Sequence, residues 1–330
     1  MQTNEQLNMV ILDDYHDFFN KMEIDKSLPS FITLTIFNQH ISNEQELIKK
    51  LYDYQIIVGI RERTAFTKTV LDGLPNLKLL ITTGARNASF DLDAATKNNI
   101  IVSGTQGAGE GPVDLTWGLI ISLMRGIHTE DRLARQGQWG TIVGPALTGK
   151  TLGLLGLGHI GQLVAQVGIA FGMNVIAWSE NLTAQVAKQH GAKYVNKETL
   201  FTDSDVLSVQ LKLSDRTRGI IGEKELSLMK SSSYIVNTSR GPIIDEKALI
   251  NALNTMKIAG AAIDTFDIEP LPNDHPLFST PNTIITPHIG YVTKEAYEMY
   301  TEGIIENVLA FLNHNPKRVL NPTALKNYFS

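Results

Sequence analysis

The sequence has no cysteine among its 330 residues. This excludes disulfide bonds, thiolate metal sites and cysteine nucleophiles, and it fits a reducing compartment, so we expect a cytoplasmic protein. Its eight histidines all lie more than five residues apart, so no two of them can share a helix face as metal ligands. We therefore expect no metal site.

Strong charge of one sign is also missing. Lys and Arg number 29 against 34 Asp and Glu, a net charge of −5, and we expect no nucleic-acid partner.

Residues 151–179 contain no charged side chain and are long enough for a membrane span. Glycines divide this stretch into two apolar runs, however, which favours a buried strand, turn and helix. We therefore expect no membrane span. The N-terminus has no basic start ahead of an apolar run, so we expect no signal peptide either.

Short apolar runs alternate with helix-compatible stretches along the chain. This alternation predicts βαβ units and parallel sheets, and the length corresponds to about two domains. Strands are expected at residues 9–12, 56–60, 77–82, 100–102, 152–155, 174–178, 206–210, 234–237, 260–263 and 283–285. Helices are expected at residues 43–52, 67–71, 91–97, 113–125, 130–136 and 293–312.

Three glycines follow the apolar strand at residues 152–155. Gly156, Gly158 and Gly161 have the spacing G-x-G-x-x-G and open a helical run that leads to another strand. In that context the first glycine permits a tight turn, the second lets the backbone approach a pyrophosphate, and the third allows close helix packing. The motif therefore predicts a dinucleotide site at a helix N-terminus.

The end of the next strand bears on the choice of dinucleotide. It reads Trp178-Ser179-Glu180, where such folds place an acid that binds the adenosine ribose. Glu180 could serve, and Ser179 could bind a ribose hydroxyl or a phosphate. No Lys or Arg follows before Lys188, so NAD is favoured over NADP.

Three polar residues each come just after a predicted strand in the C-terminal half. They are Arg240, Glu269 and His288. Ligands of open parallel sheets bind at the carboxyl ends of strands, and a guanidinium there suits bidentate recognition of a carboxylate. Singly, a histidine in a loop or an arginine at a surface is unremarkable. Together, downstream of a dinucleotide motif, they predict an active site.

At these residues the sequence resembles the D-isomer-specific 2-hydroxyacid dehydrogenase family. The motifs GLGHIG, NTSRGPIIDEKAL, AAIDTFDIEPLP and TPHIG occur in order, and the resemblance runs from about residue 9 to 322. It implies two doubly wound parallel-sheet domains. A flavodoxin-like substrate domain would comprise residues 1–104 and 298–330, and a Rossmann NAD-binding domain residues 105–297. A homodimer formed through the cofactor domain is also implied.

The resemblance further implies a reaction, in which a small anionic D-2-hydroxy acid and its 2-keto acid are interconverted with NAD(H). His288 would give a proton to the carbonyl oxygen, Glu269 would orient the ring and favour its protonated form, and Arg240 would bind the carboxylate. The implied substrate contacts are Arg61, Gly84, Ala85, Arg86, Arg240 and His288. The expected cofactor contacts are Gly156, Gly158, His159, Ile160, Gly161, Ser179, Glu180, Gln210, Thr238, Ser239, Arg240, Asp264, His288 and Gly290.

The sequence departs from the family pattern at several positions. Ser179 replaces a frequent aspartate, Arg86 stands where the substrate loop often has glycine, and Lys212 stands where proline is common. Formate dehydrogenases resemble the family but pair their histidine with glutamine, so Glu269 argues against that activity. An NADH-sensing binding protein of the corepressor type remains an alternative. Hydroxypyruvate, glyoxylate, pyruvate and 3-phosphohydroxypyruvate all remain possible substrates.

Overall fold

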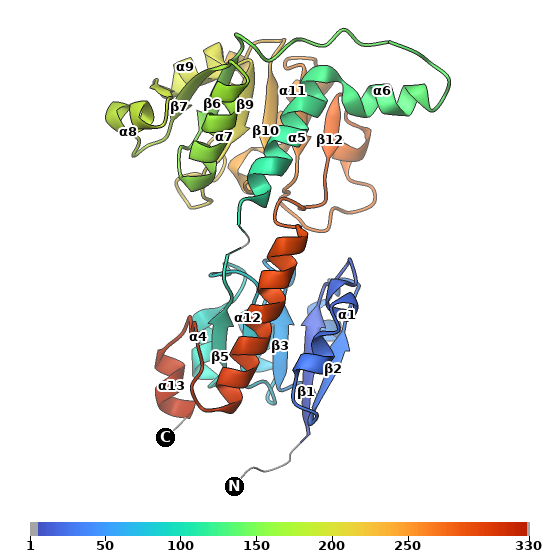
Figure 1. The fold of residues 1–330 in the computed structure, drawn as a ribbon, viewed down its shortest axis with the longest axis vertical. Helices are drawn as coiled ribbons and strands as arrows, with labels where there is room; N and C mark the ends of the chain where they lie inside the picture. The colour runs from blue at the N-terminus through green and yellow to red at the C-terminus, as the bar shows by residue number, and fades with distance from the viewer. Residues whose placement is uncertain (1–5, 108, 329–330) are drawn as a thin grey trace. The chain divides into compact units, whose positions relative to one another are not determined.

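The computed structural model describes residues 6–107 and 109–328. Contacts divide the chain into two compact units (Figure 1). Unit 1 comprises Met1–Gly109 with Val292–Ser330, and unit 2 comprises Glu110–Tyr291. The domain boundaries drawn from the sequence, at residues 104/105 and 297/298, stay a prediction.

Unit 1 is built on a parallel sheet with the strand order β2-β1-β3-β4-β5. This is the flavodoxin-like order. Strands β3 to β5 are buried along their whole length, as expected for a parallel sheet covered on both faces. The strands are β1 (Leu7–Leu12), β2 (Ile32–Ile36), β3 (Ile56–Gly59), β4 (Leu79–Thr82) and β5 (Ile101–Gly104).

The helices of unit 1 cover this sheet. Side chains at their N-caps, such as Asn43 and Asp91, accept hydrogen bonds from the first turn and so fix where the helices begin. The helices are α1 (Phe18–Lys21), η1 (Ile24–Ser27), α2 (Glu44–Leu51), α3 (Lys68–Asp72), α4 (Leu92–Lys97), α12 (Lys294–Leu312) and α13 (Thr323–Tyr328).

The C-terminal part of the chain belongs to unit 1, where α12 lies across the sheet (Figure 1). Asn307 Nδ2 and Arg318 Nε both donate to Gly104 O at the end of β5. Leu320 N donates to Val102 O, so the tail also pairs with β5. These hydrogen bonds fix the tail on the first domain although some 200 residues separate them in sequence.

Unit 2 has a parallel sheet with the order β12-β11-β10-β9-β6-β7-β8. Numbered within the unit, this is the Rossmann order 3-2-1-4-5-6 with one further strand. Separate apolar clusters lie on its two faces, one below α5 and α7 and the other below α9 to α11, so the sheet is doubly wound. The strands are β6 (Thr151–Leu155), β7 (Asn174–Trp178), β8 (Lys193–Tyr194), β9 (Val206–Val209), β10 (Tyr234–Asn237), β11 (Gly260–Ile263) and β12 (Thr283–Ile285). The helices are α5 (Gly111–Arg125), α6 (Ile127–Ala134), α7 (His159–Ala170), α8 (Ala184–Gln189), α9 (Lys197–Asp203), α10 (Glu223–Leu228), η2 (Gly241–Ile243), α11 (Glu246–Asn254) and η3 (Pro276–Ser279).

The predicted fold class is confirmed, and each expected strand has its counterpart in the structure. Two strands were not predicted, β2 and the two-residue β8. The helix expected at residues 130–136 begins earlier and ends earlier, as α6. Residues 151–179 form β6, α7 and β7, and within the described residues no helix is long and apolar enough to span a membrane.

Candidate active site

The glycine turn between β6 and α7 has the shape that a dinucleotide requires. Gly156 has a φ of +105°, and a Cβ there would come within 2.7 Å of Gln210 O. A Cβ on Gly161 would lie 2.5 Å from Gly156 O, whereas one on Gly158 would meet nothing within 4 Å. Gly156 and Gly161 are therefore required by close packing, and the backbone at Gly158 is open to a ligand.

The N-terminus of α7 faces this opening. Gly158 is its N-cap and supplies no side chain, so the first N–H groups of the helix are not capped by that residue. His159 is exposed, Ile160 is half-buried, and neither is acidic. The turn therefore fits the pyrophosphate of NAD, whose negative charge the helix dipole favours.

Residues on the neighbouring strands surround the turn. Ser179 is half-buried after β7 and Glu180 is exposed beyond it. Gln210 follows β9, and its Cβ lies against the position of Gly161. The structure thus brings Gln210 next to the glycine turn, while the side chains of Ser179 and Glu180 lie at the end of the adjacent strand.

The loop after β10 is fixed by Asn237. Its Oδ1 accepts from Ser239 N and its Nδ2 donates to Arg240 O. Thr238 Oγ1 lies 2.6 Å from Thr116 Oγ1 of α5, and Ser239 Oγ donates to a backbone carbonyl after β9. Arg240 is half-buried, and its Nη1 donates to Ser239 O. These bonds hold the guanidinium at the carboxyl end of the sheet.

Asp264, at the end of β11, clamps the loop that carries His288. Its Oδ1 accepts from Thr286 Oγ1 at 2.6 Å and from Ile289 N at 2.8 Å, and its Oδ2 accepts from Gly290 N at 3.0 Å. The carboxyl group is fully buried, and this burial raises the pKa of Asp264. Any contact of Asp264 with a nicotinamide would have to share oxygens that already accept these bonds.

His288 is held in a strained conformation and paired with Glu269. Its φ is +50°, in the left-handed region that residues other than glycine rarely adopt. Nδ1 of His288 lies 2.6 Å from Glu269 Oε2, and Glu269 Oε1 accepts from Phe266 N at 2.9 Å. With Nδ1 committed to the carboxylate, Nε2 is the ring nitrogen that can exchange a proton with a ligand.

In unit 1, the predicted substrate loop lies at the carboxyl ends of β3 and β4. Arg61 has a φ of +52° and its backbone N donates to Thr83 Oγ1. Gly84 has a φ of +100°, and a Cβ there would collide with the Arg61 guanidinium. The N–H of Gly84 donates to Thr105 Oγ1 at 2.7 Å, so this group is already engaged. Ala85 and Arg86 are both exposed.

Thr116 and Thr286 were not predicted as site residues from the sequence. Thr116 lies on α5, 122 residues before its partner Thr238, so nothing in the local sequence indicates the contact. Thr286 was visible as the first residue of the TPHIG motif, and its hydroxyl completes the Asp264 clamp. Among the described residues, no cluster of three or more His, Asp or Glu could hold a metal ion.

Comparisons with known proteins identify the family of the chain. The family model for the NAD-binding domain of D-isomer-specific 2-hydroxyacid dehydrogenases matches residues 117–290. A glyoxylate reductase from Aeropyrum pernix is 34% identical over 327 residues, which cover 90% of this chain and 96% of that protein. A crystal structure of a candidate D-3-phosphoglycerate dehydrogenase oxidoreductase from Ralstonia solanacearum superposes with a TM-score of 0.91 at 38% identity, covering 98% of this chain and 99% of that chain.

A more distant structure contains ligands. The D-lactate dehydrogenase from Aquifex aeolicus, complexed with NAD and lactic acid, has a TM-score of 0.76 at 28% identity and covers 95% of this chain and 99% of that one. The chain therefore belongs to the D-isomer-specific 2-hydroxyacid dehydrogenase family, and it is an NAD-dependent oxidoreductase of that family.

Proposed function

We propose that the enzyme reduces a small 2-keto acid to the D-2-hydroxy acid, with His288 as proton donor, Glu269 as its partner and Arg240 as the carboxylate ligand. The observation that carries the proposal is the 2.6 Å contact between His288 Nδ1 and Glu269 Oε2. This contact leaves Nε2 for the substrate, and the left-handed backbone at His288 is a feature common at functional sites.

NADH, when bound at the glycine turn, supplies the hydride. The chain's own residues provide the rest of the chemistry. Protonated His288 donates from Nε2 to the carbonyl oxygen, and Glu269 stabilises the positive charge of the ring until the proton has moved. The guanidinium of Arg240 binds the substrate carboxylate and polarises the carbonyl, which stabilises the charge that develops on its oxygen.

In unit 1, we propose that the loop at residues 83–86 binds the carboxylate through backbone N–H groups. Because the N–H of Gly84 donates to Thr105, the backbone N–H groups of Ala85 and Arg86 are the candidates for binding the carboxylate. Gly84 contributes the positive φ of the loop. Arg61 and Arg86 add positive charge, which a protein of net charge −5 needs locally in order to attract an anion.

Glyoxylate is the substrate to be tested first, because the Aeropyrum pernix relative is a glyoxylate reductase and matches 90% of this chain. The decisive assay compares glyoxylate, hydroxypyruvate, pyruvate and 3-phosphohydroxypyruvate with NADH, and then with NADPH. Turnover of at least one keto acid with NADH supports the proposal. NADH binding without turnover of any keto acid contradicts it and favours the binding-protein alternative.

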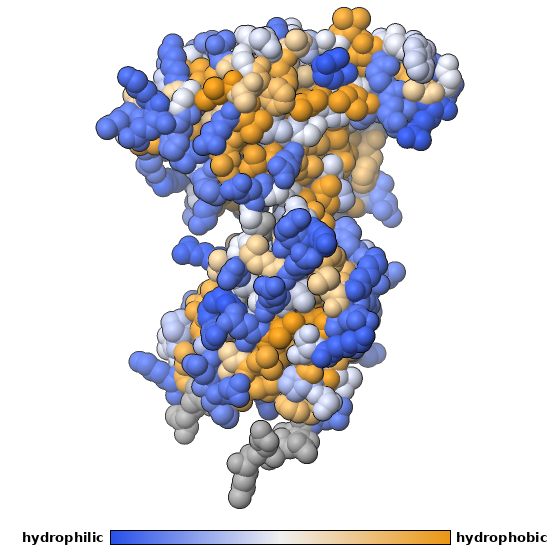
Figure 2. Space-filling model, viewed as in Figure 1, coloured by the Kyte–Doolittle hydropathy of each residue, from blue (hydrophilic) through white to orange (hydrophobic). Residues whose placement is uncertain are grey.

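We further propose a cytoplasmic homodimer formed by unit 2. The helix α6 buries none of its side chains, and the following loop exposes 91% of Trp139 and all of Val143. Figure 2 shows hydrophobic surface over the part of unit 2 in which Figure 1 places α5 and α7. Exposed apolar side chains gathered in this way are typical of an interface.

Light scattering on the purified protein tests this assembly. We expect the mass of a dimer for the wild type and of a monomer for Trp139→Glu combined with Val143→Glu. A monomeric wild type contradicts the proposal. Because both substitutions lie in an exposed loop, the far-ultraviolet circular dichroism should stay unchanged.

A further inference from the structure

Residues 265–275 form the segment that carries Glu269. Its far end, at residue 275, is held by another histidine–glutamate pair. His275 Nε2 lies 3.0 Å from Glu246 Oε1, and both side chains are largely buried. Glu246 is the first residue of α11, and His275 directly precedes η3. The pair therefore joins the start of a helix to a point six residues beyond Glu269.

The hydrogen bonds of His275 define its tautomer. Leu277 N donates to Nδ1 at 3.3 Å, so Nδ1 holds no proton and Nε2–H donates to the Glu246 carboxylate. Leu277 is buried in the core of unit 2, so its N–H fixes the ring relative to that core. Both ring nitrogens are occupied, and the ring holds a position rather than transferring a proton.

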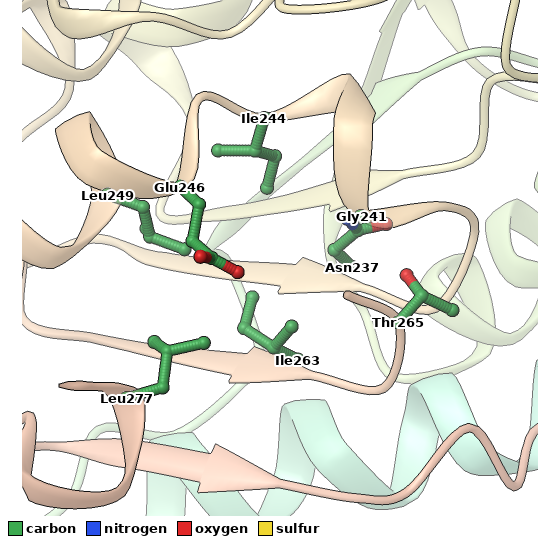
Figure 3. A pocket seen from close by; sticks show the side chains of 8 residues that line it. All are labelled: Asn237, Gly241, Ile244, Glu246, Leu249, Ile263, Thr265 and Leu277. Atoms are coloured by element: carbon green, nitrogen blue, oxygen red, sulfur yellow. The ribbon is translucent and has the colours of Figure 1, made fainter. Parts of the chain in front are cut away.

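A small cavity is lined in part by Glu246 of this pair (Figure 3). Thr265 Oγ1 on its wall is buried, and no group in the described part of the chain hydrogen-bonds to it. The residues that line the cavity are Asn237, Gly241, Ile244, Glu246, Leu249, Ile263, Thr265 and Leu277.

We propose that Glu246 and His275 are positioning residues, which fix the far end of residues 265–275 and thereby the direction of the Glu269 carboxylate. This inference rests on the proposed roles of His288 and Glu269. Glu269 Oε1 is bonded to Phe266 N in the same segment, so a shift of the segment carries the carboxylate with it. A 2.6 Å hydrogen bond to His288 tolerates little displacement.

The charged groups around this segment are Asp267, Arg218 and Asp245, in addition to the pair itself. Burial raises the pKa of Asp267, and Arg218 opposes this rise. On the side of His288, the charged neighbour from β11 is Asp264. All four residues are retained in the variants of His275, Glu246 and Glu223, so their titration is common to the pH profiles of those variants.

The two nitrogens of His275 can be replaced separately. In His275→Asn the amide oxygen stands in for Nδ1 and can still accept from Leu277 N, but the bond to Glu246 is lost. In His275→Gln the amide nitrogen stands in for Nε2 and can still donate to Glu246. Glu246→Gln keeps an acceptor and Glu246→Ala removes it. Glu223→Ala is the matched control, because Glu223 is the exposed first residue of α10.

We expect kcat for keto-acid reduction to fall about tenfold in His275→Asn and Glu246→Ala, with KM little changed. The basic limb of the pH profile should move to lower pH in both, because the Glu269 carboxylate then supports the protonated ring less well. His275→Gln, Glu246→Gln and Glu223→Ala should keep most of the activity. Lower melting temperatures with unmoved pH profiles would show a purely structural role and overturn the inference.

A second measurement needs no turnover. The proton in the short His288–Glu269 bond should give a downfield proton NMR resonance, identified by its loss in His288→Asn. We expect it to exchange faster with water in His275→Asn and Glu246→Ala than in Glu223→Ala. Equal exchange rates overturn the inference whatever the activity. If the variants differ in exchange rate as expected but the wild type turns over no keto acid, only the proposed function is overturned.

Discussion

The pairs His288–Glu269 and His275–Glu246 use the same two side chains in opposite orientations. In the first, Glu269 is bonded to Nδ1 and leaves Nε2 for a ligand. In the second, Glu246 is bonded to Nε2 while Nδ1 accepts a backbone N–H. The residue types alone therefore do not decide whether a histidine–glutamate pair acts in catalysis or in support. The role depends on whether a ring nitrogen remains available to a ligand.

The backbone conformations of His288 and His275 also differ. His288 has a φ of +50° and lies in a loop clamped by the buried Asp264. His275 has an ordinary φ of −64° and serves as the N-cap of η3. Of these two histidines, only the one that we propose transfers a proton has a left-handed backbone, a conformation that clusters at functional sites.

Replacing the proposed proton donor tests the comparison most strongly. We expect His288→Asn to lower kcat about 10³-fold, because general acid catalysis is lost. NADH affinity, measured by fluorescence titration, should remain within a factor of about two. Turnover close to that of the wild type would remove the distinction between the two histidines.

The partner carboxylate should have the next largest effect. In Glu269→Gln we expect kcat for reduction to fall about 30-fold near neutral pH, since an amide supports an imidazolium less well than a carboxylate does. The basic limb of the reduction profile should shift to lower pH, while oxidation of the hydroxy acid, which needs the neutral ring, should extend to lower pH. An identical pair of profiles for variant and wild type contradicts the pairing.

The clamp at Asp264 allows a test by stability alone. In Asp264→Asn the amide NH2 replaces an oxygen that accepts from a backbone N–H, so we expect a loss of about 2 kcal/mol in the free energy of unfolding. Asp245→Asn is the matched control, because Asp245 caps α11 from an exposed position where asparagine caps equally well. Urea denaturation measures both. Equal losses would show that the strained loop needs no special clamp.

Much of this arrangement could be predicted from the sequence. The glycine motif and the order of Arg240, Glu269 and His288 after predicted strands placed these residues at one edge of a sheet. The strand β2 was not predicted because it is an edge strand in which Thr alternates with Ile and Leu, so it has no apolar run. The pairing of His275 with Glu246 depends on contact across 29 residues, and the engagement of the Gly84 N–H by Thr105 depends on side-chain direction. Neither leaves a local signal in the sequence.

The smallest expected effect concerns the alkaline side of the pH–activity profiles. There, a loss of catalysis has to be distinguished from unfolding of the protein. Burial raises the pKa of Tyr300 in unit 1 to about 12, an effect that Arg61 opposes, and no described group hydrogen-bonds to its hydroxyl. The unfolded phenol ionises near pH 10 and the folded one does not, so the stability from this group is complete below pH 10. It is lost as pH rises toward 12, by about 1.4 kcal/mol for each pH unit.

Tyr300→Phe removes this dependence. We expect the variant to match the wild type in urea denaturation at pH 7 and to exceed it at pH 11. The basic limb of the reduction profile should be the same in both, because it reports on His288 in unit 2. If Tyr300→Phe moved that limb, unfolding of unit 1 would explain the alkaline loss of activity, and pH profiles could no longer distinguish the two histidine–glutamate pairs.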